Sequence, residues 1–122
     1  MRDDDRIRIE HMLDAADTVG QFIAGHNLGD LDTDRKLLFA VVRAIEVIGE
    51  AAGRTSEELR SRATPIPWRA IIAMRNRLIH GYFDIDTEIV WRTATAEVPP
   101  LPLLRALLEA DPKKESEGEG KD

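Results

Sequence analysis

Apolar side chains recur every three or four positions along most of the chain, which is the spacing of one face of an α-helix. The first such run predicts a helix over about residues 4–24, and the second predicts a helix from an N-cap at Asp32 through Ala52. Glycines between positions 25 and 29 separate the two runs, so we expect an antiparallel hairpin. The predicted buried faces are Ile9, Met12, Leu13, Ala16, Val19 and Ile23 in the first helix and Leu38, Val41, Val42, Ile45, Ile48 and Ala52 in the second.

Prolines and cap residues divide the rest of the chain into shorter helices. Ser56 followed by two acids predicts a helix to about residue 62, and Pro67 suits the first turn of a helix that continues to about residue 80. Asp86 is placed to cap a helix through about residue 97, and the pair Pro99-Pro100 separates it from a last helix ending near residue 110. No segment alternates apolar and polar residues as a strand would. The pattern predicts an all-α, up-and-down bundle of about five helices in residues 1–110 and a disordered polar tail in residues 111–122.

The helix predicted over residues 67–80 has an arginine where apolar residues are expected. At about 100° per residue, with Ile71 at zero, Arg75 falls at about 40°, in the centre of the apolar stripe. Since a guanidinium stays charged, it must extend to solvent, pair with a carboxylate, or face a pocket or partner that supplies anions. Asn76, Arg77 and His80 fall on the other side. Because Arg75 and His80 diverge by roughly 140°, they can meet on one ligand only where the helix ends or across a dimer.

The second predicted helix offers carboxylates that could neutralise this arginine. Arg43, Glu46 and Glu50 follow one polar stripe beside its apolar face. Gly49 on the apolar face would let another helix approach closely. If the helix that carries Arg75 packs there, Glu46 or Glu50 could neutralise it or the nearby Arg77. From the spacing alone, an ordinary surface pair between Arg43 and Glu46 is the preferred interpretation, and such a pair contributes little to stability.

Composition narrows the class of protein. The 122-residue chain has a net charge of -6 and no cysteine, which excludes disulfides and thiolate chemistry and suits a reducing cytosol. The first ten residues are too charged for a secretory signal, and no apolar run approaches membrane-spanning length, so we expect a cytoplasmic protein.

The negative net charge of the chain argues against nucleic-acid binding over the whole surface. The segment from Arg54 to His80, however, has six arginines against two glutamates, a local balance of +4. This segment can hold a phosphate backbone or be an ordinary solvated surface.

Arg75, Asn76 and His80 suit the cleavage of a phosphodiester without a metal. An imidazole titrates near neutrality and can take the proton of a ribose 2′-hydroxyl or return one. A guanidinium binds two phosphate oxygens and stabilises charge in the transition state, and an amide can orient the phosphate or the imidazole. The three histidines are spread over separate segments, so no metal site is expected. From the residues alone, His80 can also be a favourable charge at a helix C-terminus.

Three blocks of this sequence resemble, in the same order, the HepT toxins of the HEPN superfamily. They are "RAIEVIGEAAG", "IPWRAIIAMRNRLIHGYFDID" and "EIVWRTATAEVPPL", and "RNRLIHGY" in the second block fits the R-x4-H-x-Y signature of that family. The resemblance covers most of residues 5–110. It implies a HEPN-like bundle that dimerises, with a cleft shared by two protomers. It also implies a metal- and cofactor-independent endoribonuclease toxin in which Arg75 and His80 are catalytic and Asn76 and Arg77 support them. The RNA substrate is left open, with tRNA as one candidate.

The same resemblance implies a protein partner. Toxins of this family are paired with a minimal nucleotidyltransferase antitoxin, MntA, which attaches AMP to a tyrosine, and Tyr82 matches that tyrosine. The added phosphates would bring negative charge and bulk into the place where RNA must bind. Without the family, Tyr82 is interpreted as an aromatic packed under the loop, and Trp68 and Trp91 as core residues. Two other functions stay open: a non-catalytic nucleotide- or substrate-binding partner of a nucleotidyltransferase, and a purely structural helical dimer.

Overall fold

The computed structural model describes residues 1–78, 85–98 and 102–111, and within these ranges every regular element is helical. The prediction of an all-α bundle is therefore confirmed. None of the described helices is both long enough and apolar enough to cross a membrane. The elements are α1 (Asp3–Ile23), α2 (Leu28–Thr33), α3 (Arg35–Gly53), α4 (Glu57–Arg62), α5 (Trp68–Leu78), α6 (Thr87–Arg92), the π-helical turn η1 (Thr93–Glu97) and α7 (Pro102–Glu109).

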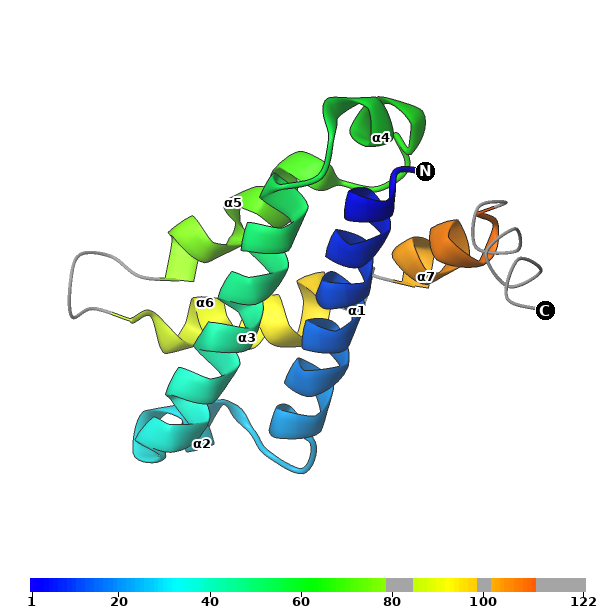
Figure 1. Ribbon diagram of the computed structural model, residues 1–122. Coiled ribbons are helices and arrows are strands. Elements are labelled where there is room, and N and C mark those ends of the chain that lie inside the picture. Colours follow the sequence, from blue (N-terminus) through cyan, green and yellow to red (C-terminus); the bar gives the residue numbers. More distant parts are fainter. Residues whose placement is uncertain (79–84, 99–101, 112–122) are drawn as a thin grey trace.

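The long helices α1 and α3 form the predicted antiparallel hairpin and run side by side through the middle of the molecule (Figure 1). Burying each large apolar side chain between them stabilises the fold by about 1.5–3 kcal/mol. The pattern of positions three and four apart is confirmed as the buried face of both helices. Side chains with no exposed surface in this hairpin are Ile9, Met12, Val19, Val41, Ile45, Ile48 and Ala52. Helix α5 packs against α3, and α6 contacts both α3 and α5.

The start of the second long helix differs from the prediction. Asp32 is not its N-cap: the structure begins α3 at Arg35, and the carboxylate of Asp34 accepts a hydrogen bond from the backbone N–H of Leu37 at 3.1 Å. Asp32 lies instead within the short helix α2. The periodic pattern could not separate the two helices, because both carry apolar residues at helical spacing.

A reciprocal cap begins helix α2, in the segment that the sequence predicted only to separate the first two long helices. The side chain of Asn27 accepts from the backbone N–H of Asp30 at 3.2 Å, and the Asp30 carboxylate accepts from the backbone N–H of Asn27 at 3.0 Å. The ring of His26 adds a contact to the same carboxylate at 2.9 Å. The backbone hydrogen bond from Asn27, followed by the one from His26, holds the pKa of Asp30 below its ordinary value.

Two predicted caps are confirmed and position the elements around α5. The hydroxyl of Ser56 accepts from the backbone N–H of Leu59 at the start of α4. The carboxylate of Asp86 accepts from the backbone N–H groups of Glu88 and Ile89 at the start of α6. These side chains satisfy backbone donors that a helix N-terminus leaves without partners.

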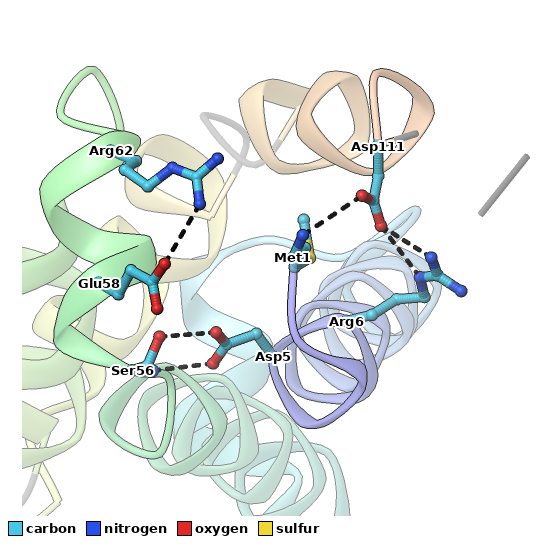
Figure 2. A network of polar contacts seen from close by, with 7 residues as sticks. All are labelled: Met1, Asp5, Arg6, Ser56, Glu58, Arg62 and Asp111. Atoms are coloured by element: carbon cyan, nitrogen blue, oxygen red, sulfur yellow. Dashed lines mark hydrogen bonds and ion pairs between the residues drawn. The ribbon is translucent and has the colours of Figure 1, made fainter. Parts of the chain in front are cut away.

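Polar contacts attach the start of α4 and the segment after α7 to the first turn of α1 (Figure 2). Asp5 accepts from the backbone N–H and the hydroxyl of Ser56 at 2.8 and 2.6 Å, which ties α1 to the cap of α4. Arg6 donates to Asp111 at 2.8 Å and ties α1 to the residues after α7. Asp111 was assigned to the disordered tail, and for this residue the prediction is wrong because its carboxylate is buried by the pair with Arg6. The rest of the predicted tail, residues 112–122, lies outside the described residues.

Candidate functional site

Helix α5 rests on the core through one regular stripe. Trp68, Ile71, Met74 and Leu78 follow one another at intervals of three or four residues and are all buried. The indole N–H of Trp68 donates to the backbone carbonyl of Ala63 at 3.0 Å, so this side chain is a core residue, as predicted. The opposite side of α5 is left open to solvent. The candidate residues Arg75, Asn76 and Arg77 lie in its last turn.

A glycine in α3 allows α5 to approach closely, as the sequence predicted. A Cβ atom added at Gly49 would lie 3.4 Å from the backbone carbonyl oxygen of Ile71 and 3.7 Å from the Cβ of Arg75. These are contact distances for a methyl group, and a longer side chain would meet the backbone of α5. Gly49 therefore brings the base of the Arg75 side chain directly onto α3.

Arg75 is not in the centre of the apolar stripe. Its side chain is 47% exposed, because the buried side of α5 is turned toward Met74 and Leu78 and leaves Arg75 at the margin. The guanidinium lies 3.9 Å from a carboxylate oxygen of Glu50. Of the three outcomes expected for this arginine, the structure shows two together: it extends to solvent and it pairs with a carboxylate.

Glu50 is shared between two arginines from different helices. Its carboxylate accepts a hydrogen bond from Arg43 at 3.3 Å, in addition to the contact with Arg75. Arg43 also lies 4.0 Å from Glu46, which is the surface pair expected from the spacing. The predicted contact of Arg75 with the polar stripe of α3 is thus made by Glu50, and Glu46 pairs only with Arg43 among the described residues.

Arg77 is held on the other flank of α5 by a contact that no sequence pattern indicated. Its two terminal nitrogens donate to the two carboxylate oxygens of Glu97 at 3.1 and 2.7 Å. Glu97 comes from η1, 20 residues along the chain, so no helical spacing could have revealed the pair. Asn76 is exposed between the two arginines. Arg75 and Arg77 therefore point to separate carboxylates on either side of Asn76.

His80 and Tyr82 lie outside the described residues, so the predicted meeting of Arg75 and His80 on one ligand stays a prediction. The described part of the chain has no group of three or more His, Cys, Asp or Glu side chains that could hold a metal ion. Among the described residues, the site consists of the half-exposed guanidinium of Arg75, the exposed amide of Asn76 and the carboxylate of Glu50, which restrains the guanidinium. Such a set can bind and orient a phosphate, and it needs a proton-transfer group to cleave one.

Known proteins resemble this chain along most of its length. It matches the family described as "Ribonuclease HepT-like" over residues 12–107. A "Probable ribonuclease HepT" of Thermococcus cleftensis is 34% identical over 93 residues, which are 76% of this chain and 84% of that protein. A protein named "Putative RNase" of Caldanaerobacter subterraneus subsp. tengcongensis is 36% identical over 93 residues, 76% of this chain and 83% of the relative. No solved structure matches the chain.

Proposed function

This chain belongs to the HepT-like family of ribonucleases, and from that membership we propose that it is a metal-independent endoribonuclease toxin whose Arg75 and His80 cleave RNA. The observation that carries the proposal is the position of Arg75. It is the first residue of the R-x4-H pattern, it is half exposed, and Glu50 and the close approach at Gly49 restrain it. A guanidinium that is restrained but open to solvent is suited to bind a phosphate without a large loss of side-chain entropy.

The proposed reaction needs only groups that the chain and the RNA supply. His80 takes the proton of a ribose 2′-hydroxyl, and the 2′-oxygen attacks the adjacent phosphorus. The bond between phosphorus and the 5′-oxygen of the next nucleotide breaks, and that oxygen leaves with the proton that His80 gives back. The products are a 2′,3′-cyclic phosphate and a free 5′-hydroxyl. Arg75 stabilises the charge that builds up on the two non-bridging phosphate oxygens, and Asn76 hydrogen-bonds one of them.

A homodimer is part of the proposal, because one helix does not direct Arg75 and His80 to the same side. Their directions differ by roughly 140° on a regular helix, so the two groups can meet on one phosphate only if the helical geometry does not continue to His80 or if a second copy supplies one of them. Two protomers that meet near the C-terminal ends of their α5 helices would gather two such pairs in one cleft and leave the rest of each helix free. Light scattering that shows only monomer at micromolar concentration would remove this part of the proposal.

The proposed partner is an MntA-like minimal nucleotidyltransferase that neutralises the toxin by attaching AMP to Tyr82. In this transfer the phenol oxygen bonds to the α-phosphorus of ATP, and pyrophosphate leaves. The attached phosphate adds negative charge beside the RNA site and repels the substrate. Mass spectrometry after incubation with such an enzyme and ATP tests this step: we expect one AMP on the peptide that contains Tyr82, and an adduct on any other residue would overturn the assignment.

Cleavage of a fluorescent RNA by purified variants tests the catalytic pair. We expect Arg75→Ala and His80→Ala to reduce kcat by roughly two to four orders of magnitude, the size of a general-base or charge-stabilising contribution, and to keep their helical circular dichroism. Arg92→Ala and His11→Ala are the matched controls, since both residues are exposed and neither lies in α5 or takes part in the contacts described for the site, and we expect wild-type rates for them. If both site variants cut RNA as fast as the parent, the assignment is wrong. Binding of a nucleotidyltransferase by a chain that never cuts RNA would favour the non-catalytic partner subunit.

A further inference from the structure

The positive charge of the segment that includes α4 and α5 is compensated at some arginines and not at others. Three of them have carboxylate partners: Arg62 with Glu58, Arg75 with Glu50 and Arg77 with Glu97. The other three, Arg54, Arg60 and Arg69, form no ion pair with any residue in the described ranges. The excess charge that the sequence indicated is therefore found beside α4 and the start of α5, not at Arg75 itself.

Arg60 and Arg69 line one groove, which we call the Arg69 groove. It has a volume of about 490 Å³, and none of the described residues that line it has a carboxylate. Its residues are Arg60, Trp68, Arg69, Ile72, Ala73 and Asn76. One terminal nitrogen of Arg60 donates to the carbonyl of Ala52 and the hydroxyl of Thr55, at 3.4 and 3.5 Å, which fixes the guanidinium at the rim.

The groove runs along α5 and reaches the candidate site. Arg69, Ile72, Ala73 and Asn76 are spaced at i, i+3, i+4 and i+7, so they share one face of the helix. The rise from Arg69 to Asn76 is about 10 Å at 1.5 Å per residue. Arg69 also lies in the first turn of α5, where the helix dipole adds positive potential. The groove therefore has cations at one end, apolar side chains along its floor and an amide next to Arg75 at the other end.

We infer that the Arg69 groove binds the RNA strand beside the cleavage point, with a phosphate on Arg69 and Arg60 and a nucleoside against Ile72 and Ala73. A ribose-phosphate chain offers this alternation of anionic and less polar groups. Among the described residues that line the groove the one aromatic side chain, Trp68, is only 7% exposed, so we expect contacts to backbone and shape that select little for base identity. This inference rests on the proposed function, because it takes the phosphate at Arg75 to be the one that is cleaved.

Salt-dependent binding tests the groove without cleavage. The probe is a fluorescein-labelled dodecamer of 2′-O-methyl RNA, which has no 2′-hydroxyl proton to lose. We expect Arg69→Gln to weaken binding severalfold and to reduce the slope of log K against log salt by about 0.7, the contribution of one single-strand phosphate contact. Arg92→Gln is the matched control, because it removes the same charge from an exposed residue outside the groove, and its slope should equal that of the parent. Arg60→Lys is the second variant of the groove. A normal thermal melt of each of the three variants excludes unfolding as the cause of a change in binding.

Cleavage kinetics separate a failure of this inference from a failure of the proposed function. For a long RNA, Arg69→Gln should raise KM and leave kcat unchanged, whereas a dinucleotide that fills only the cleavage position should be cut as by the parent. If the parent cuts RNA and Arg69→Gln behaves like Arg92→Gln in every assay, the groove inference fails and the proposed function stands. If Arg69 controls RNA binding but no variant or parent cuts RNA, the groove stands and the proposed function fails. A change of oligomeric state in Arg69→Gln with unchanged RNA affinity would make the groove a protein interface and overturn the inference.

Discussion

The close approach of α5 to α3 at Gly49 predicts that alanine and leucine at this position have opposite effects on stability. An alanine Cβ would lie 3.4 Å from the Ile71 carbonyl oxygen, 3.5 Å from that of Ile72 and 3.7 Å from the Cβ of Arg75, so it fits without a shift. Alanine in a helix interior is more stable than glycine by about 0.5–1 kcal/mol, and Gly49→Ala should show this gain. The further carbons of a leucine must displace the backbone of α5, which costs about 1–3 kcal/mol.

Gly20 in α1 provides the matched control, because it is also inside a long helix and nothing lies within 4 Å of an added Cβ. There both alanine and leucine should raise the free energy of unfolding, measured by urea denaturation with circular dichroism at 222 nm as the signal. At Gly49 only alanine should do so. Equal stability of Gly49→Leu and Gly49→Ala would show that α5 does not rest on α3 at this point, and the restraint on Arg75 would then lose its basis.

Three further changes test the polar contacts. Asp111→Asn should lower the free energy of unfolding by roughly 3–5 kcal/mol, because the buried guanidinium of Arg6 and the N-terminal ammonium group both lose this carboxylate, and wild-type stability in urea denaturation would contradict these contacts. Arg77→Gln should cost only about 0.5 kcal/mol in the same assay, since its pair with Glu97 is exposed to solvent, and a loss of several kcal/mol would show that more depends on it. The native pKa of Asp30 lies below the ordinary 3.8, so its carboxylate stabilises the fold fully above that pH and loses this effect as the pH falls through the native pKa. Asp30→Asn should therefore remove this part of the dependence of the unfolding free energy on pH. An acidic part of the stability curve that is unchanged in Asp30→Asn would refute this role of Asp30.

The sequence predicted those parts of the fold that depend on neighbours within a helix. Periodicity found α1 and α3 and their buried faces, because the two helices bury one regular stripe each. The caps at Ser56 and Asp86 were found because a cap depends on residues only two or three positions away. The close approach at Gly49 was predicted because a glycine inside a helix lowers its stability, and on an apolar face it also makes room for a second helix.

Contacts between side chains far apart in the sequence could not be predicted in this way. Arg77 meets Glu97 across 20 residues, and Arg6 meets Asp111 across 105, so neither pair has a local signal. The place of Arg75 was misjudged because an angle on an isolated helix does not say how the helix is rolled on its neighbour. A roll of α5 toward Met74 was enough to turn the arginine from the centre of the stripe to its margin.

The restraint on Arg75 is weak enough for a phosphate to replace it. Glu50 forms a hydrogen bond with Arg43 at 3.3 Å but lies 3.9 Å from Arg75, so the carboxylate is held mainly by its own helix. An exposed ion pair of this kind contributes between zero and about 1 kcal/mol, whereas a hydrogen bond to a charged group contributes about 1.5–3 kcal/mol. From this comparison we expect a phosphate that reaches Arg75 to outcompete Glu50 for the guanidinium. Under the proposed function, the carboxylate would remain on Arg43 and receive Arg75 again when the products leave, so Glu50 would hold the arginine in place between turnovers without blocking the substrate.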